Sequence, residues 1–219
     1  MKKVFIVANW KSNKDESEAK DWLDGFKIQN LELINKEIII CPPFTLLSQV
    51  ASEVISRKLK VKVGAQNISP FDGGAYTGEI NGKQIKEFVD YVIIGHSERR
   101  QNFSETDETL FRKVDQALKY DLTPIFCVQG KETKVPPNVA IVAYEPIDAI
   151  GTGQSDTAEN AEEVASFFKK NYNVQYTLYG GSITSKNVKE FTQMPNIDGV
   201  LIGGASLDVK EFYAIIQNA

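Results

Sequence analysis

Short runs of consecutive apolar residues recur along the chain. Runs of Val, Ile and Leu without alternation are typical of strands buried on both faces, as in a parallel sheet covered by helices. Eight strands are predicted in this way: Val4–Asn9, Glu37–Cys41, Val61–Ala65, Tyr91–Ile94, Leu122–Val128, Val139–Glu145, Gln175–Tyr179 and Gly199–Ile202.

Most of these strands are separated by segments with apolar residues at helical spacing. In Glu16–Phe26, for example, Ala19, Trp22 and Leu23 would share one face of a helix. Further helices are predicted over Leu46–Arg57, from Ser104–Asp107 onward, and over Thr157–Lys170, Ser185–Phe191 and Val209–Ile216. Thr45 carries a hydroxyl that can cap the helix that begins at Leu46.

The alternation of strands and helices predicts a parallel α/β fold, and eight strands in succession predict closure into a (β/α)8 barrel. One connection is unusually short, because Gln129–Asn138 has ten residues, including Pro136 and Pro137. Since a crossover between parallel strands needs about 10–12 residues with its helix, the helix after the fifth strand is expected to be missing or reduced to a turn. No linker divides the chain, so residues 1–219 are expected to form a single domain.

Composition and charge narrow the range of partners. The chain is 42% hydrophobic and carries a formal net charge of −4, so broad attraction to nucleic acid or to an acidic membrane is not expected. Cys41 and Cys127 lie in apolar runs and give neither a disulfide framework nor the ligand spacing of a metal site. No apolar stretch approaches the roughly 20 residues that cross a bilayer, and the first apolar run ends at Asn9. We therefore expect a soluble, cytoplasmic protein.

Polar and glycine-rich residues gather where several predicted strands end. The clusters are Asn9-Trp10-Lys11, Gly95-His96-Ser97-Glu98-Arg99-Arg100, Glu145-Pro146, Gly180-Gly181-Ser182 and Gly203-Gly204-Ala205-Ser206. An ordinary loop would explain any one of them. Because active sites of (β/α)8 barrels form at the carboxyl ends of the strands, all five clusters would meet at one rim, and together they favour a site.

Two of these side chains have the chemistry of proton transfer. His96 is the only histidine, and N–H groups at the start of a following helix would favour its neutral form, which can donate a hydrogen bond to a substrate oxygen. A lone histidine is otherwise more often structural, and without a second His or a Cys cluster a zinc site is not expected. Glu145 ends an apolar strand, where partial desolvation would make its carboxylate a stronger base.

Glycines and one lysine indicate an anionic ligand. Gly180-Gly181 and Gly203-Gly204 let backbone N–H groups approach a phosphate, although such pairs also mark tight turns. Lys11 can supply positive charge to a phosphate or a developing oxyanion, the alternative being a surface lysine. Gly151 and Gly153, which follow Glu145, can serve either a closing lid or a rigid turn.

Motifs along the whole chain resemble, in the same order, those of the triosephosphate isomerase family. They are Asn9-Trp10-Lys11, Gly64-Ala65-Gln66-Asn67, Gly74-Ala75-Tyr76-Thr77-Gly78-Glu79, Gly95-His96-Ser97-Glu98-Arg99-Arg100, Tyr144-Glu145-Pro146, Ala149-Ile150-Gly151-Thr152-Gly153, Tyr179-Gly180-Gly181-Ser182 and Gly203-Gly204-Ala205-Ser206-Leu207. The resemblance implies a TIM barrel and an isomerase that interconverts dihydroxyacetone phosphate and D-glyceraldehyde 3-phosphate through an enediolate. It also implies a place in glycolysis and gluconeogenesis, with no metal or organic cofactor.

The same resemblance implies roles for matching residues. Glu145 corresponds to the catalytic base, His96 to the electrophile that also shuttles a proton between oxygens, and Lys11 to the cationic group. Asn9 is then a polar neighbour in the pocket, and Glu98 a carboxylate near the lysine. Phosphate ligands are implied at Gly151, Ser182, Gly203 and Gly204, a lid at Pro146, Ile147, Asp148, Ala149, Ile150, Gly151, Thr152 and Gly153, a closed-lid anchor at Tyr179, and an apolar clamp over the base at Ile150 and Leu201.

The resemblance also leads to expectations about the subunit assembly and about the lid. Thr77 lies in a segment resembling the family's third loop, which inserts into a partner subunit, so a homodimer is expected. Asp148 stands where the family commonly has tryptophan, and we expect this to change the equilibrium of the lid. Two other functions stay open, namely another barrel enzyme acting on a related phosphate and a non-catalytic sensor of sugar phosphates. The pair of His96 and Glu145 favours chemistry over sensing.

Overall fold

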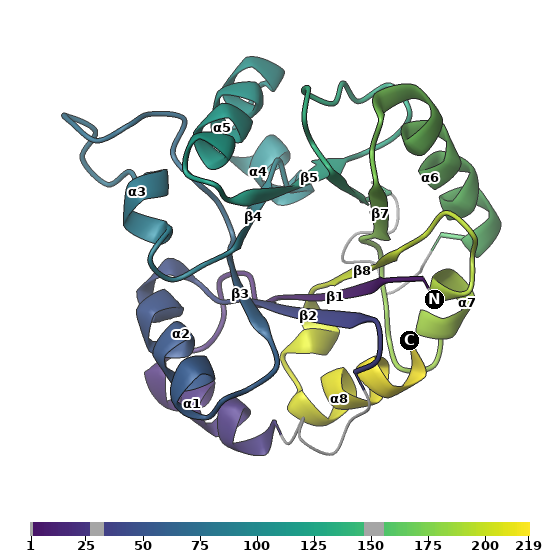
Figure 1. The fold of residues 1–219 in the computed structure, drawn as a ribbon, viewed down its shortest axis with the longest axis horizontal. Coiled ribbons are helices and arrows are strands. Elements are labelled where there is room, and N and C mark those ends of the chain that lie inside the picture. Colours follow the sequence, from purple (N-terminus) through teal and green to yellow (C-terminus); the bar gives the residue numbers. More distant parts are fainter. Residues whose placement is uncertain (1, 27–32, 147–155) are drawn as a thin grey trace.

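The computed structural model describes residues 2–26, 33–146 and 156–219. Within these residues eight parallel strands form a closed barrel in chain order, with β8 pairing to β1 (Figure 1). The strands are β1 (Val4–Asn9), β2 (Lys36–Cys41), β3 (Lys62–Ala65), β4 (Tyr91–Ile94), β5 (Thr123–Val128), β6 (Ile141–Tyr144), β7 (Tyr176–Tyr179) and β8 (Gly199–Ile202). The predicted (β/α)8 architecture is confirmed.

Helices surround this ring of strands (Figure 1). They are α1 (Glu16–Gly25), α2 (Leu47–Ser56), α3 (Gly82–Ile85), α4 (Ser97–Asn102), α5 (Asp107–Lys119), α6 (Ala158–Tyr172), α7 (Val188–Thr192) and α8 (Val209–Asn218), with short 3-10 turns η2 (Phe44–Leu46) and η4 (Gly204–Ser206). The side chains of Thr106 and Thr157 cap α5 and α6 by accepting backbone N–H bonds. The prediction of Thr45 as a helix cap was wrong, because Thr45 lies inside η2. The residue that precedes this turn with an extended backbone is Pro43.

The connection between β5 and β6 contains no helix. Its residues, 129–140, are all described, and they form only turns and bends. Pro136 and Pro137 each lack the N–H that a helix interior requires, and the segment is too short for a full crossover unit. The prediction that the fifth helix is missing is therefore confirmed.

The strands divide the core into two layers. Alternate side chains point into the barrel, where Phe5, Val7, Ile39, Cys41, Tyr91, Ile93, Ile125, Cys127, Ile141, Ala143, Leu178 and Leu201 form one cluster. The other buried residues of the strands pack outward against the helices. Both cysteines are unpaired, and burial raises the pKa of each thiol, so they act here as small apolar side chains. In the described part of the chain, none of the helices combines the length and apolar character that crossing a bilayer requires.

At Gly199, strand β8 closes against β1, and a side chain at this position is expected to destabilise the barrel. Its φ is +155°, and a Cβ there would lie 2.0 Å from the carbonyl oxygen of Phe5. Gly199→Ala is therefore expected to lower the free energy of unfolding by about 3 kcal/mol or more, since both the backbone and the adjacent strand must move. Urea denaturation measures this change. Gly204→Ala is the control, because an added Cβ would meet no atom within 4 Å, and equal losses in the two variants would contradict the argument.

Candidate active site

The strand-end clusters surround one cavity of about 410 Å³ at the carboxyl ends of the strands. Its lining combines residues that lie in or follow β1, β4, β6, β7 and β8: Asn9, Lys11, His96, Glu145, Gly180, Gly181, Ser182, Ile183, Thr184, Asn187, Leu201, Gly203, Gly204 and Ala205. Of the residues singled out in the sequence, Glu98 lies beside this cavity, in contact with Lys11. Pro146 is the only described residue of the expected lid, and the expectations for Ile147 to Gly153 lie outside the described residues.

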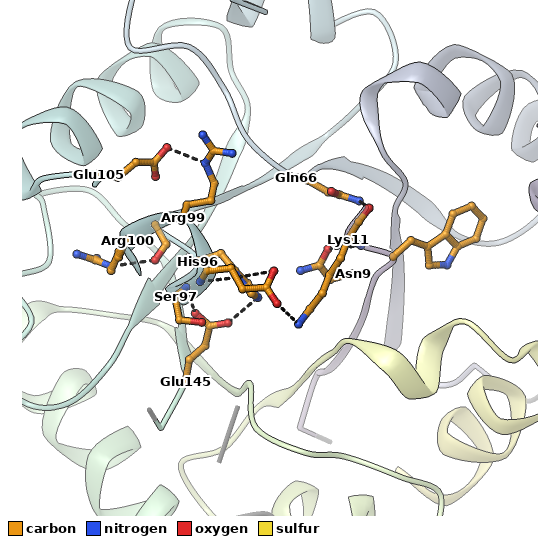
Figure 2. A network of polar contacts seen from close by, with 12 residues as sticks. Asn9, Lys11, Gln66, His96, Ser97, Arg99, Arg100, Glu105 and Glu145 are labelled. Atoms are coloured by element: carbon orange, nitrogen blue, oxygen red, sulfur yellow. Dashed lines mark hydrogen bonds and ion pairs between the residues drawn. The ribbon is translucent and has the colours of Figure 1, made fainter. Parts of the chain in front are cut away.

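Glu145 and His96 contact each other directly at this cavity (Figure 2). The Oε1 of Glu145 lies 2.8 Å from Nε2 of His96, and its Oε2 accepts the backbone N–H of Ser97 at 2.8 Å. Glu145 is only 1% exposed and His96 7%. The carboxylate is thus taken out of water, while one oxygen keeps a hydrogen bond to the backbone and the other stays in contact with the imidazole, so its position is defined.

The hydrogen bond that the His96 ring accepts indicates which nitrogen carries the proton. Its Nδ1 accepts the backbone N–H of Glu98 at 3.3 Å, so the ring proton lies on Nε2, facing Glu145. The Glu98 carboxylate lies 3.7 Å from the same Nδ1, a distance that would suit an ion pair only if the ring were cationic. Since Nδ1 already receives a donor, the neutral imidazole fits the geometry better. His96 in this form presents a single N–H to the cavity.

Two arginines fix the segment that carries His96. The Nε of Arg100 donates to the carbonyl oxygen of Gly95 at 2.9 Å, and another of its nitrogens donates to the carbonyl of Cys127 at 3.1 Å. Arg99 pairs with Glu105 at 2.7 Å (Figure 2). Bidentate guanidinium contacts to backbone hold both position and angle, so α4 is tied to the neighbouring strand.

Lys11 enters the cavity from an unusual backbone conformation. Its φ is +52°, and its backbone N–H donates to Oδ1 of Asn9 at 3.0 Å. The amide of Gln66 donates to the carbonyls of Lys11 and Cys41, each at 2.9 Å, and Nζ of Lys11 lies 2.6 Å from Oε1 of Glu98. A left-handed lysine held by two amides indicates a functional constraint. Gln66 was recognised in the sequence only as part of a family motif and was assigned no role, although an amide directly after β3 was a usable signal.

Glycines leave room for the charged side chains. A Cβ on Gly203 would lie 3.0 Å from Cε of Lys11, and one on Gly180 would lie 2.9 Å from Cγ of Glu145. At Gly180 a side chain would also meet the backbone oxygen of Tyr144 at 3.1 Å, so close approach favours glycine there, whereas at Gly203 the flexible end of Lys11 could shift. Ser182, Gly203 and Gly204 all line the cavity, and Gly151 lies outside the described residues. Thr184 and Asn187 also line it and were missed, since they lie beyond the glycine pair.

Tyr179 was expected to anchor the closed lid, and Leu201 was expected to form half of the apolar clamp over the base. The hydroxyl of Tyr179 accepts the backbone N–H of Asp156 at 2.8 Å, at the first described residue after the 147–155 segment. Leu201 lines the cavity while belonging to the apolar interior of the barrel. Ile150, the other half of the expected clamp, lies outside the described residues.

The described residues offer no group of three or more His, Cys, Asp or Glu side chains that could hold a metal ion. The side chains at the cavity carry chemistry of their own. A desolvated carboxylate, a neutral imidazole N–H and a fixed ammonium surround one space bordered by glycines. Such an arrangement can remove a proton beside a carbonyl and stabilise the resulting oxyanion.

Comparison with known proteins places the chain in a family. The sequence model described as triosephosphate isomerase matches residues 4–138 and 130–219. Triosephosphate isomerases from Mesomycoplasma hyopneumoniae (strain 7448), Alkaliphilus oremlandii and Synechococcus sp. (strain JA-2-3B'a(2-13)) are 44%, 38% and 40% identical to it. These alignments cover 100%, 99% and 99% of this chain and 100%, 100% and 97% of the relatives. The first alignment spans 246 positions against 219 residues here, and the two family matches meet at 130–138, where the helix is missing. The chain belongs to the triosephosphate isomerase family.

Proposed function

We propose that this chain interconverts dihydroxyacetone phosphate and D-glyceraldehyde 3-phosphate by proton transfer through an enediolate, as the family name indicates. The observation that carries the proposal is the 2.8 Å contact between Nε2 of His96 and Oε1 of Glu145 at the wall of a cavity that also contains Lys11. A sensor of sugar phosphates would need the cavity but not a buried base beside a neutral donor.

Glu145 acts as the base in this scheme. It takes the proton from the carbon next to the carbonyl and returns it to the neighbouring carbon, so atoms and charge balance without a co-reactant. In the described structure its carboxylate accepts a hydrogen bond from the backbone of Ser97 and lies 2.8 Å from Nε2 of His96. The substrate carbonyl must therefore replace Glu145 as the group that faces Nε2 of His96. That exchange releases the base to face the carbon.

His96 and Lys11 stabilise the oxygen charge that develops during proton transfer. The neutral imidazole donates from Nε2 and can then move a proton between the two substrate oxygens. Lys11 supplies a fixed positive charge. Its Nζ lies 2.6 Å from Oε1 of Glu98, and its backbone N–H donates to Oδ1 of Asn9. Ser182, Gly203, Gly204 and Gly151 serve as phosphate ligands, and the lid from Pro146 to Gly153 excludes water.

A turnover assay with purified chain tests this function against its alternatives. Either triose phosphate should be converted to the other without added metal or organic cofactor, as followed by NMR of the mixture. Binding without conversion would identify a sensor. Conversion of a different sugar phosphate, with neither triose phosphate used, would identify another barrel enzyme.

We also propose a homodimer in which the loop containing Thr77 enters the partner. Residues 73–79 are all exposed and extend away from the barrel between β3 and α3 (Figure 1). A second cavity of about 260 Å³ lies beside the first and includes Lys11, Arg99 and Phe103. Phe103 is 65% exposed, which suits an apolar rim covered by a second copy. We further propose a single domain of residues 1–219 in the cytoplasm, without nucleic-acid or membrane partners, consistent with the net charge of −4.

Thr77→Arg is expected to break this dimer. In the proposed arrangement the new guanidinium would approach Lys11 and Arg99 of the partner copy's cavity, so like charges would oppose insertion. Sedimentation equilibrium should show the mass falling from twice 24.4 kDa to 24.4 kDa, with kcat/KM reduced at least about tenfold. Thr77→Ser is the control, and an unchanged mass for Thr77→Arg would contradict the proposed interface.

A further inference from the structure

Residues 182–187 form a loop between the glycine pair that follows β7 and the start of α7. Four residues of this 182–187 loop line the cavity, namely Ser182, Ile183, Thr184 and Asn187. Ser182 is one of the proposed phosphate ligands. The backbone conformation of the loop therefore decides where a phosphate group can lie in the cavity.

The side chain of Asn187 connects two peptide groups of this loop. Its Nδ2 donates to the carbonyl oxygen of Ser182 at 3.0 Å. Its Oδ1 accepts the backbone N–H of Thr184 at 2.8 Å and the hydroxyl of Thr184 at 3.3 Å. Because a carbonyl only accepts and a backbone N–H only donates, these contacts need a side chain that carries both a donor and an acceptor. Asparagine supplies both, whereas an ionised aspartate of the same shape lacks the donor.

A different set of contacts ties the middle of the loop to α8. The carboxylate of Glu211 accepts the backbone N–H of Ser185 at 2.6 Å and its hydroxyl at 3.0 Å. The Nδ2 of Asn218 donates to the carbonyl oxygen of Ser185 at 2.8 Å. None of these three residues is among those that line the cavity. The contacts of Asn187 are thus the ones made at the cavity wall.

Buried apolar residues should keep the loop in place if the amide of Asn187 is removed. Ile183 is 4% exposed and Val188 is fully buried, and both belong to the apolar layer between the strands and the helices. Replacement of the half-buried Asn187 is therefore expected to leave the barrel folded. The peptide groups from Ser182 to Thr184 would gain conformational freedom, which a bound phosphate would have to remove again.

We infer that Asn187 is a positioning residue for phosphate binding in the proposed isomerase reaction, on whose assignment this inference rests. It acts through the backbone of Ser182 and Thr184, which it holds in one conformation before the substrate arrives. A site that is ordered in advance binds more tightly, because the ligand does not have to order it. The effect of Asn187 should therefore fall on substrate affinity rather than on proton transfer.

Asn187→Ala is expected to raise KM for both triose phosphates about tenfold and the dissociation constant of inorganic phosphate by a similar factor, while kcat changes less than about threefold. Initial rates and a phosphate titration followed by the amide resonances of the chain in NMR measure these quantities. If Asn187 only supported the fold, the folded fraction and kcat would fall while KM stayed the same. That result would overturn the inference.

Asn187→Asp keeps the shape of the side chain and tests the donor alone. Its carboxylate would face the carbonyl oxygen of Ser182 and would add negative charge to a cavity that binds an anion. The phosphate affinity should fall at least as far as in Asn187→Ala, and wild-type affinity would overturn the inference. Because the two side chains are nearly isosteric, this variant keeps the test usable if Asn187→Ala does not fold.

Asn218→Ala is the matched control. It also removes an asparagine amide that donates to a carbonyl of the same loop, but at Ser185, which does not line the cavity. Its KM and its phosphate dissociation constant should stay within about twofold of the wild-type values. If both rose as far as in Asn187→Ala, the effect would come from general loosening of the loop, and the inference would be wrong.

The phosphate titration also separates this inference from the proposed function. If wild type binds inorganic phosphate but converts neither triose phosphate, the proposed function fails, and the dissociation constants still decide the role of Asn187. If wild type converts both substrates and Asn187→Ala has the same KM and phosphate affinity, only the inference fails. A wild-type chain that neither binds phosphate nor converts a triose phosphate would overturn both.

Discussion

Replacing Glu145 by glutamine is expected to lower kcat about 10³-fold while the chain stays folded. The amide cannot accept a proton from carbon, and removing a general base typically costs about 10²–10⁴ in rate. Glutamine has nearly the same shape and can still accept the N–H of Ser97, which the carboxylate accepts at 2.8 Å. Steady-state kinetics in both directions, together with thermal unfolding, measure the two effects separately.

Glu145→Asp distinguishes loss of the base from loss of its position. Aspartate keeps the charge but withdraws the carboxylate by about one bond length, and a displacement near 1 Å can cost about 10²-fold in rate. The expected order of kcat is therefore wild type, then Asp, then Gln. If glutamine were as active as wild type, another group would have to take the proton, and the assignment of Glu145 would be wrong.

The barrel was predictable because its strands are buried on both faces. Val139–Glu145 and Gln175–Tyr179, for instance, were predicted as strands, and β6 and β7 lie within them. The spacing of apolar residues was less informative about helices that are too short to carry a long apolar stripe. The four-residue α3 and the 3-10 turn before α2 were therefore not predicted, since short elements depend on local caps such as Asn81 and on Pro43.

The candidate site was predictable to the level of which strand ends carry it. Position at or just after the end of a strand was enough to single out Asn9, Lys11, His96 and Glu145, which line one cavity. Contacts between residues distant in sequence were not predictable, because they depend on the register of neighbouring strands. Gln66, 55 residues from Lys11, and the contact between Ser97 and Glu145 belong to this class.

Asp148 stands where the family commonly has tryptophan, and its expected effect on the lid stays a prediction from the resemblance. The residue itself lies outside the described residues. The described flank nevertheless carries a second aspartate, Asp156, whose contacts with Tyr144 and Tyr179 no sequence pattern indicated. Both tyrosines belong to the motifs that were recognised in the sequence, whereas Asp156 does not, and its contacts depend on the packing of β6 against β7.

Replacing His96 by glutamine is expected to lower kcat about 10²-fold or more. Glutamine retains an N–H that can point toward the substrate oxygen, but it cannot both give and take a proton, so the transfer between oxygens is lost. The fall in kcat should exceed the fall caused by losing a single hydrogen bond. The reason is that the imidazole is also fixed through Nδ1, which accepts the backbone N–H of Glu98 at 3.3 Å. Initial rates with each triose phosphate measure kcat and KM.

Combining His96→Gln with Glu145→Gln tests whether the two side chains act on one reaction. If they serve successive proton transfers on the same bound substrate, the double variant should be scarcely slower than Glu145→Gln alone, since the first transfer already fails. If their losses multiply, His96 contributes independently, for example by binding. Their contact at 2.8 Å makes the first result the expected one, and wild-type kcat in His96→Gln would exclude the imidazole from the mechanism.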